Sequence, residues 1–439
     1  MTEKRITVDF LHKLGRVSPV AGLLGGPLFD RDSRYDFTEE YKELGLSAIR
    51  LADAECGAWG FLDLHNLFPD VSLDETSPLS YNFSTADKLV LSAHATGAEL
   101  MLRIGETPEP YEVKNFTRPP RDLAKYARIA EKIVAHYNKG FADGYKLGIK
   151  YIEITSSPDD GGFVGDAESH FELYRAIAEH LKSVYPKLRV GGCSFGGFSS
   201  LNRLKTTERE RAFVLFTEKF LALVGKNKVP LDFFSWKCRA ESAEELSLHA
   251  RYADTHLNHN GLKRAESIIS EFSLSGLSPR ETKYPAVLSS SLITAEKSGV
   301  SMLFLGNTHP NSDKCPVFTL DDGVTKKKYA SYAVIRAFSK MLSRGLYLVE
   351  TSADCRRELY SLASTDGNAG YILLATGEFN GNITISAEGA EFRTYTVEGI
   401  LGGGERGAGF STSLSDIPFD GKITLRAGKY EVYFISLFA

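Results

Sequence analysis

The sequence predicts a (β/α)8 barrel followed by a C-terminal β-sandwich domain. Between residues 17 and 345, short apolar strands alternate with amphipathic helices, which is the pattern of a parallel sheet with helical connections. After Gly345, short strands follow one another with Gly, Asn and Asp turns between them, as in a sandwich. A chain of 439 residues has room for a barrel and a smaller module. We therefore place the barrel at residues 11–345, and the sandwich at residues 346–439 together with residues 1–10.

The barrel prediction depends on eight apolar runs that are typical of buried strands. These runs are residues 20–24, 48–51, 99–104, 151–154, 188–193, 233–236, 267–270 and 301–304. Helix signals lie between them. We expect Ser84 to cap one helix that ends at Gly97, Pro119 and Pro120 to open a second that reaches Gly140, and a third to cover residues 168–185 before Pro186.

The sandwich prediction depends on seven short segments with strand-like composition. They are residues 346–350, 359–363, 371–376, 383–386, 392–397, 423–425 and 430–436. Turn pairs such as Asp366-Gly367 and Asn380-Gly381 separate them, as in hairpins. We expect residues 5–10 to add a strand to this domain, and residues 350–430 to contain strands instead of helices.

The composition excludes several classes of partner. The formal net charge of −4 gives no reason to expect nucleic acid or an anionic membrane, and no apolar run reaches the roughly 20 residues that span a bilayer. The first residues lack the apolar core of a secretory signal, and the five cysteines include no CxxC pair, so we expect reduced thiols and a cytoplasmic location. His256 and His259 have ligand spacing but end a polar helix, so we expect neither a metal nor a cofactor. The oligomeric state stays open.

Polar and aromatic residues collect where the predicted barrel strands end, and in a barrel this end binds ligands. Carboxylates, cations and aromatic rings together suit a carbohydrate, because rings pack against the C–H faces of sugars; any one ring can equally belong to the core. The candidate substrate-binding residues are Arg50, Asp53, Glu55, Glu106, Ser156, Asp159, Trp236, Lys237 and Asn307.

Two of these strand ends resemble glycoside hydrolase family 39, the family of β-xylosidases and α-L-iduronidases. At the fourth strand, members typically read Trp-Glu-Ile-Trp-Asn-Glu-Pro-Asp, and residues 152–159 here read Ile-Glu-Ile-Thr-Ser-Ser-Pro-Asp. At the sixth strand, members read Phe-Ser-Trp-His or similar, and residues 234–237 read Phe-Ser-Trp-Lys. Many members carry a His where this chain has Ala52. The resemblance covers most of the chain and implies that Glu271 stands at the nucleophile position and Ser157 at the acid/base position.

This departure has a direct chemical consequence. A retaining glycosidase needs two carboxyl groups about 5–5.5 Å apart, one to attack the sugar and one to protonate the leaving group. The hydroxyl of Ser157 is too weak an acid for the second role. If the strand ends are neighbours, Lys237 lies beside Glu271, lowers the pKa of that carboxylate and pairs with it. Arg50 and Arg239 add further positive charge.

We therefore expect a protein similar to family 39 that binds carbohydrate, including anionic sugars, and whose hydrolysis is impaired or absent. Two alternatives stay open. One is an active retaining glycosidase with an unusual acid, supplied by Asp159, Asp160 or Glu106. The other is a non-catalytic scaffold or interaction protein, against which the carboxylates and rings at the strand ends argue mildly.

Overall fold

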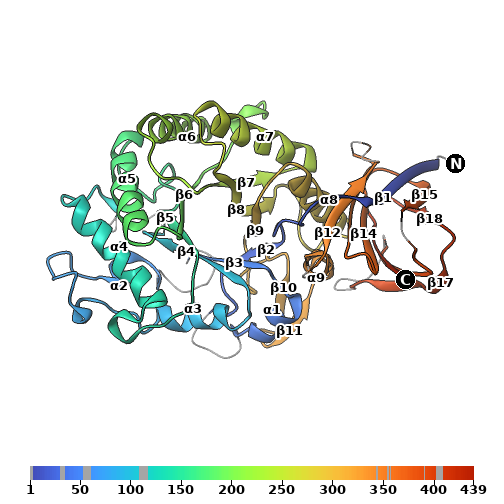
Figure 1. Cartoon of the computed structure of the whole chain (residues 1–439), viewed down its shortest axis with the longest axis horizontal. Helices are drawn as coiled ribbons and strands as arrows, with labels where there is room; N and C mark the ends of the chain where they lie inside the picture. The colour runs from blue at the N-terminus through green and yellow to red at the C-terminus, as the bar shows by residue number, and fades with distance from the viewer. Residues whose placement is uncertain are drawn as a thin grey trace.

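A closed barrel of eight parallel strands forms the larger part of the molecule (Figure 1). The structure is a computed structural model, and it describes residues 3–29, 35–52, 61–107, 117–342, 345–352, 355, 357–389, 391–401 and 409–439. The barrel strands are β2 (Gly22–Leu24), β3 (Ala48–Leu51), β4 (Glu99–Ile104), β5 (Tyr151–Ile154), β6 (Arg189–Phe195), β7 (Phe233–Ala240), β8 (Glu266–Leu274) and β9 (Met302–Leu305). Because β9 pairs with β2, the sheet closes. The predicted barrel is confirmed, and each strand lies on one of the eight apolar runs.

Helices surround the barrel on the outside (Figure 1). They are α1 (Thr38–Leu44), α2 (Leu64–Leu67), α3 (Ala86–His94), α4 (Leu123–Asn138), α5 (Ala167–Val184), α6 (Glu208–Asn227), α7 (Ala243–His259), α8 (Tyr284–Lys297) and α9 (Ala330–Met341), with short 3-10 turns η3 (Pro78–Ser80), η5 (Phe141–Asp143) and η6 (Ser199–Leu201). Their apolar faces pack on the strands in one continuous core. Within the described residues, no helix has the length and apolar character that a membrane span requires.

Two predicted helix starts are wrong. Ser84 does not cap α3, because its hydroxyl donates to the side chain of Asn82 and the helix begins two residues later. The second helix does not open at the proline pair. It begins at Leu123, because the carboxylate of Asp122 accepts a hydrogen bond from the Lys125 backbone N–H and so satisfies a free donor of the first turn.

The C-terminal strands form one nine-stranded sheet in the order β17-β16-β19-β14-β13-β12-β1-β15-β18. Their bounds are β1 (Glu3–Gly15), β12 (Tyr347–Thr351), β13 (Leu359–Thr365), β14 (Ala369–Thr376), β15 (Gly381–Glu388), β16 (Thr394–Ile400), β17 (Ser411–Pro418), β18 (Lys422–Ala427) and β19 (Val432–Phe438). Strand β1 pairs antiparallel with β12 and parallel with β15, so the first residues of the chain join this sheet. Strands β12 to β19 follow Gly345, where we propose that the second domain begins.

The sheet has two buried faces. One encloses its own apolar core, which includes Ile6, Ile372 and Ile435, and this core gives the sheet its sandwich-like character. The other face packs against the barrel, because Leu362 and Phe434 belong to the barrel core. Strand β17 and the hairpin of β10 (Phe318–Asp321) and β11 (Thr325–Lys328) were not predicted, because their mostly exposed residues lack an apolar pattern.

Candidate active site

Irregular pairing at the ends of β7 and β8 positions the central residues of the site. Trp236 pairs with Ile269, whereas Lys237 pairs with Glu271, so Ser270 is an extra residue in β8. Such a bulge allows two successive side chains to reach the barrel interior. The hydroxyl of Ser270 lies 2.9 Å from that of Ser194, and Glu271 reaches Lys237. Register shifts of the same kind interrupt the pairing of β6 with β7 and of β8 with β9.

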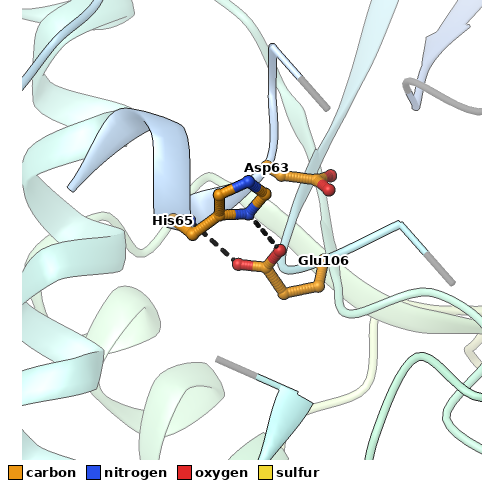
Figure 2. Close-up of side chains that lie close together, drawn as sticks. All are labelled: Asp63, His65 and Glu106. Atoms are coloured by element: carbon orange, nitrogen blue, oxygen red, sulfur yellow. Dashed lines mark hydrogen bonds and ion pairs between the residues drawn. The ribbon is translucent and has the colours of Figure 1, made fainter. Parts of the chain in front are cut away.

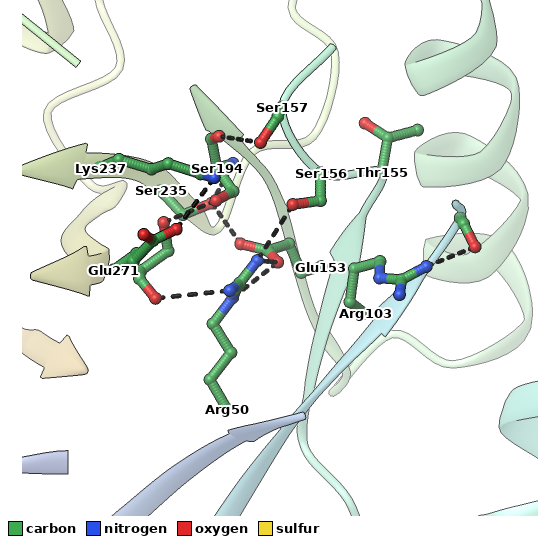
Figure 3. A network of polar contacts seen from close by, with 12 residues as sticks. Arg50, Arg103, Glu153, Thr155, Ser156, Ser157, Ser194, Ser235, Lys237 and Glu271 are labelled. Atoms are coloured by element: carbon green, nitrogen blue, oxygen red, sulfur yellow. Dashed lines mark hydrogen bonds and ion pairs between the residues drawn. The ribbon is translucent and has the colours of Figure 1, made fainter. Parts of the chain in front are cut away.

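A buried ion pair joins β3 and β5 beside Glu271 (Figure 3). Arg50 donates from Nε and Nη2 to Glu153 Oε2, at 2.9 Å and 2.5 Å. Glu153 Oε1 accepts from the hydroxyl of Ser235 at 2.6 Å. Arg50 is 2% exposed and Glu153 is 0% exposed, so both charges are removed from water and compensated by each other. Arg50, which was predicted to bind substrate, is instead bound to Glu153 in this pair.

The position at which the resemblance predicts the acid/base residue, Ser157, is buried and carries no charge. Ser157 is fully buried, and its hydroxyl lies 3.5 Å from the backbone oxygen of Ser194, toward which it points in Figure 3. Its backbone N–H donates to Cys193 O at 3.0 Å. The φ angle of Ser157 is 50°, in the left-handed region that costs most residues energy. Ser156 is also buried, and its hydroxyl lies 3.4 Å from Arg50 Nη2.

Glu271 and Lys237 form an ion pair. Lys237 Nζ lies 2.9 Å from Glu271 Oε2 (Figure 3). Arg239 Nη2 lies 3.8 Å from Glu271 Oε1. Burial raises the pKa of Glu271, but Lys237, Arg239 and Arg50 outweigh it, so the net direction is downward. Glu271 is therefore ionised and compensated. Gly306 makes room for it, since a Cβ at that position would lie 2.8 Å from Glu271 Cγ.

A cavity of about 480 Å³ opens beside Glu271. This size is within the range of small-molecule sites. The polar lining comes from the ends of β7 and β8 and from the loops that follow β8 and β9. It combines hydroxyl, amide and charged groups: Arg239, Ser273, Ser275, Ser278, Asn307, Asp313 and Lys314. Asn307, a predicted ligand contact, follows β9 in a left-handed conformation with φ 57°.

Other predicted residues lie elsewhere. Trp236 is fully buried, donates from Nε1 to Ser267 Oγ at 3.0 Å and packs on Phe198, so it belongs to the core between barrel and helices. Asp53 and Glu55 lie outside the described residues. Asp160 forms an ion pair with Arg209 near the surface.

Glu106 belongs to a compact cluster with Asp63 and His65 (Figure 2). One of its oxygens accepts from the His65 backbone at 2.9 Å, and the other lies 2.7 Å from His65 Nδ1. Asp63 Oδ1 accepts from Arg103 at 2.7 Å and from both donors of Thr107. Three carboxylate oxygens thus already have donors, and a metal ion here would lie near the Arg103 guanidinium. These contacts fit a structural network that fixes the end of β4.

Asp159 is the carboxyl group closest in sequence to Ser157. Its Oδ2 accepts from the Gly196 backbone at 2.8 Å, and its Oδ1 is buried without a hydrogen-bond partner among the described residues. Burial raises its pKa to about 7, although Gly196 and Lys237 act in the opposite direction.

This carboxyl predicts a pH-dependent stability. The unfolded carboxyl ionises near its ordinary pKa of 3.8 and the folded one near 7, so between these values the unfolded state binds fewer protons and the free energy of unfolding falls as pH rises. We expect Asp159→Asn to remove this dependence. Its stability relative to the parent chain should rise by about 3–5 kcal/mol from about pH 4 to about pH 8. Urea unfolding across that range checks the result, and a difference independent of pH would contradict it.

Sequence reasoning missed the residues that connect the strand ends. Glu153 was noted only as part of a family motif, yet a charged residue between Ile152 and Ile154 in a buried strand is itself a signal, because an unpaired charge there would be costly. Ser235 was likewise noted only as part of the motif at residues 234–237, and Ser194 and Ser270 carried no signal, because serine is common in loops and at strand ends.

Comparison with known proteins places the chain in a family. The family model of glycosyl hydrolases family 39 matches residues 45–284, more than half of the chain. A β-xylosidase of Geobacillus stearothermophilus is 23% identical over 234 residues, which are 50% of this chain and 42% of that protein. A β-xylosidase of Caldicellulosiruptor saccharolyticus is 22% identical over 246 residues, 53% of this chain and 45% of the relative. The matches thus span less than half the length of these relatives.

Solved structures share the fold. A glucosidase from Croceicoccus marinus superposes with a TM-score of 0.79 at 21% identity, covering 100% of both chains. A monomeric β-xylosidase from Caulobacter crescentus gives 0.70 at 15% identity and covers 99% of each chain. The family 39 enzyme of Xanthomonas axonopodis gives 0.69 at 15% identity, with 100% of this chain and 98% of the other covered. From the family match over residues 45–284, the chain belongs to glycosyl hydrolase family 39.

Proposed function

We propose that this family 39 protein binds carbohydrate in the cavity beside Glu271 and is impaired in hydrolysis. The ion pair between Lys237 and Glu271, at 2.9 Å, is the observation that carries the proposal. A retaining glycosidase uses one carboxylate as a free nucleophile. Here a cation lowers the pKa of Glu271 and holds the carboxylate, which makes the oxygen a weaker nucleophile. At the acid/base position, Ser157 supplies no proton at any working pH.

An active glycosidase with a replacement acid is the second candidate. Asp159 favours it, because its raised pKa keeps the carboxyl partly protonated near neutral pH, as a general acid requires. The hydrogen bond that Asp159 accepts from Gly196 directs one oxygen to the backbone of the neighbouring loop. Glu106 and Asp160 are less suited to the role, since His65 and Arg209 occupy their oxygens. The scaffold alternative has no observation in its favour.

The charge of the cavity supports a preference for acidic sugars such as uronates. Lys237 neutralises Glu271, while Arg239 and Lys314 line the cavity and Asp313 offsets one of them. Guanidinium and ammonium groups bind carboxylates well. Arg50 does not contribute directly, because Glu153 already binds it.

We expect calorimetry to show tighter binding of acidic than of neutral oligosaccharides. Lys237→His should weaken binding of a uronate by about tenfold, since it removes a permanent cation beside the carboxylate of Glu271. Lys263→Gln, a change at an exposed lysine after α7, serves as the matched control and should leave the affinity unchanged. Stronger binding of neutral sugars, with uronate affinity unaffected by Lys237→His, would show that the charge argument is wrong.

A further inference from the structure

We propose that the Glu271 site transfers a glycosyl group to an anionic acceptor, inorganic phosphate being the simplest, in preference to water. The inference rests on the proposed function, because it requires a missing acid/base carboxyl and a Glu271 that still reacts slowly with activated glycosides. The proposed transfer takes place after Glu271 has formed an ester with the sugar.

Lys237 is left with an uncompensated charge once the ester has formed. In the free protein its ammonium lies 2.9 Å from Glu271, and its side chain is 18% exposed. When Glu271 becomes an ester, its negative charge disappears and Lys237 loses its counter-ion. A largely buried cation without a partner is unfavourable, because its lost hydration is not compensated. An anion from solution that binds beside Lys237 relieves this cost, and it does so next to the reacting carbon.

Other described carboxyl groups near Lys237 are poor substitutes for that anion. Glu153 is already held by Arg50 and Ser235. Asp159 interacts electrostatically with Lys237, but burial raises its pKa and favours its neutral form. Meanwhile Arg239 and Lys314 line the cavity that leads to Glu271, and cations at the walls of a cleft raise the local concentration of anions.

The two steps, formation of the Glu271 ester and its cleavage by an acceptor, also differ in the protons that they require. In the first, an oxygen of Glu271 attacks the anomeric carbon, the bond to the leaving group breaks, and the leaving group departs with its electron pair as an anion. Water would then have to lose a proton during its attack, and Ser157 cannot accept one. A phosphate oxygen attacks without losing a proton. The new bond joins the anomeric carbon to that oxygen, and the electron pair of the broken ester returns to Glu271.

The absence of a carboxylate at position 157 has a further effect. In an ordinary retaining enzyme, the acid/base residue becomes a negative general base in the second step and repels an incoming anion. Ser157 and Ser156 are neutral here, so this repulsion is missing. The substrates that fit are therefore glycosides whose leaving group is stable as an anion, and the products are glycosyl esters of the acceptor acid.

The experiment uses the full chain with a dinitrophenyl β-xyloside and inorganic phosphate, against sodium chloride at equal ionic strength. We expect phosphate to raise dinitrophenolate release at least about tenfold, which is less than the roughly 10²–10⁴-fold that a positioned general base contributes. Phosphorus NMR should show a glycosyl phosphate of retained configuration. Lys237→Met should lose the phosphate effect, and Lys263→Gln should keep it. Glu271→Gln should abolish release, which confirms the nucleophile.

The possible failures have different meanings. A phosphate effect equal to that of sodium chloride, or inhibition by phosphate with free sugar as the sole product, would overturn the transfer proposal while leaving the proposed function intact. Efficient hydrolysis of unactivated disaccharides without phosphate would overturn both, because it requires an acid that we do not assign. If the Lys237→Met variant fails to fold, the transfer proposal is still tested, because the comparison of phosphate with chloride uses the parent chain.

Discussion

Hydrolysis of nitrophenyl xylosides is expected to be negligible, and the Ser157→Glu change alone is expected not to restore it. A general acid contributes about 10²–10⁴ in rate, and Ser157 supplies none of it. A glutamate at this position would gain a carboxyl group, but Glu271 would remain paired with Lys237 at 2.9 Å.

The double variant Ser157→Glu with Lys237→His is expected to exceed the sum of the two single changes. The first change supplies an acid, and the second releases the nucleophile, so each is of little use without the other. We expect a gain of about 10²-fold or more over the parent chain, measured as kcat/KM on nitrophenyl xyloside. Dinitrophenyl xyloside needs little protonation, so it should react slowly in the parent chain and gain less.

The controls separate this expectation from the replacement-acid alternative. If Asp159 is the acid, the parent chain should cleave unactivated disaccharides efficiently and Asp159→Asn should abolish that activity. If the parent chain is silent and Asp159→Asn changes only the pH dependence of stability, the degenerate site is supported.

Loss of one partner of the buried Arg50–Glu153 pair is expected to produce the largest change in stability. Arg50→Met leaves the Glu153 carboxylate fully buried, and among the described residues the hydroxyl of Ser235 is then its remaining side-chain donor. Removing one partner of a buried pair typically costs about 3–5 kcal/mol, because the other charge is left uncompensated. Urea unfolding at neutral pH should therefore show a decrease of that size in the free energy of unfolding.

Two further variants show whether the cause is the unpaired charge. The double change Arg50→Met with Glu153→Leu removes both charges and should recover most of the loss, since apolar replacement of a buried pair is often neutral. Glu172→Gln breaks the half-exposed pair with Arg175 on α5, and its effect should be a small fraction of that of Arg50→Met. A destabilisation by Arg50→Met no larger than this control would contradict the assigned role.

The barrel could be predicted from the sequence because its cause is local. Runs such as Tyr151–Ile154 are apolar enough to be buried on both faces, and helices with their own start and stop signals lie between them. Most strands of the nine-stranded sheet could be predicted for the same reason. Strand β17 is the exception, because its residues are mostly exposed and polar and match no strand pattern. It is a strand because it pairs with β16.

The candidate site could be predicted from the sequence only in part. The resemblance to family 39 directed attention to Ser157, Lys237 and Glu271, and the contact between Lys237 and Glu271 follows from the pairing of β7 with β8. The direction in which a side chain points could not be predicted from the sequence. Trp236 was expected at the ligand and faces the core, because the alternation of a strand places neighbours of Lys237 on the opposite face.

The sequence by itself therefore determined the order of strands and helices, the family and the residue types at the strand ends, since these depend on local pattern and on motifs along the chain. The tertiary structure decided which charges compensate one another: Arg50 with Glu153, and Lys237 with Glu271. The physical reason is that an ionised group in a barrel is stabilised by whichever partner the closed sheet brings within a few ångströms. For Arg50 and Glu153 that partner is 103 residues away in the chain.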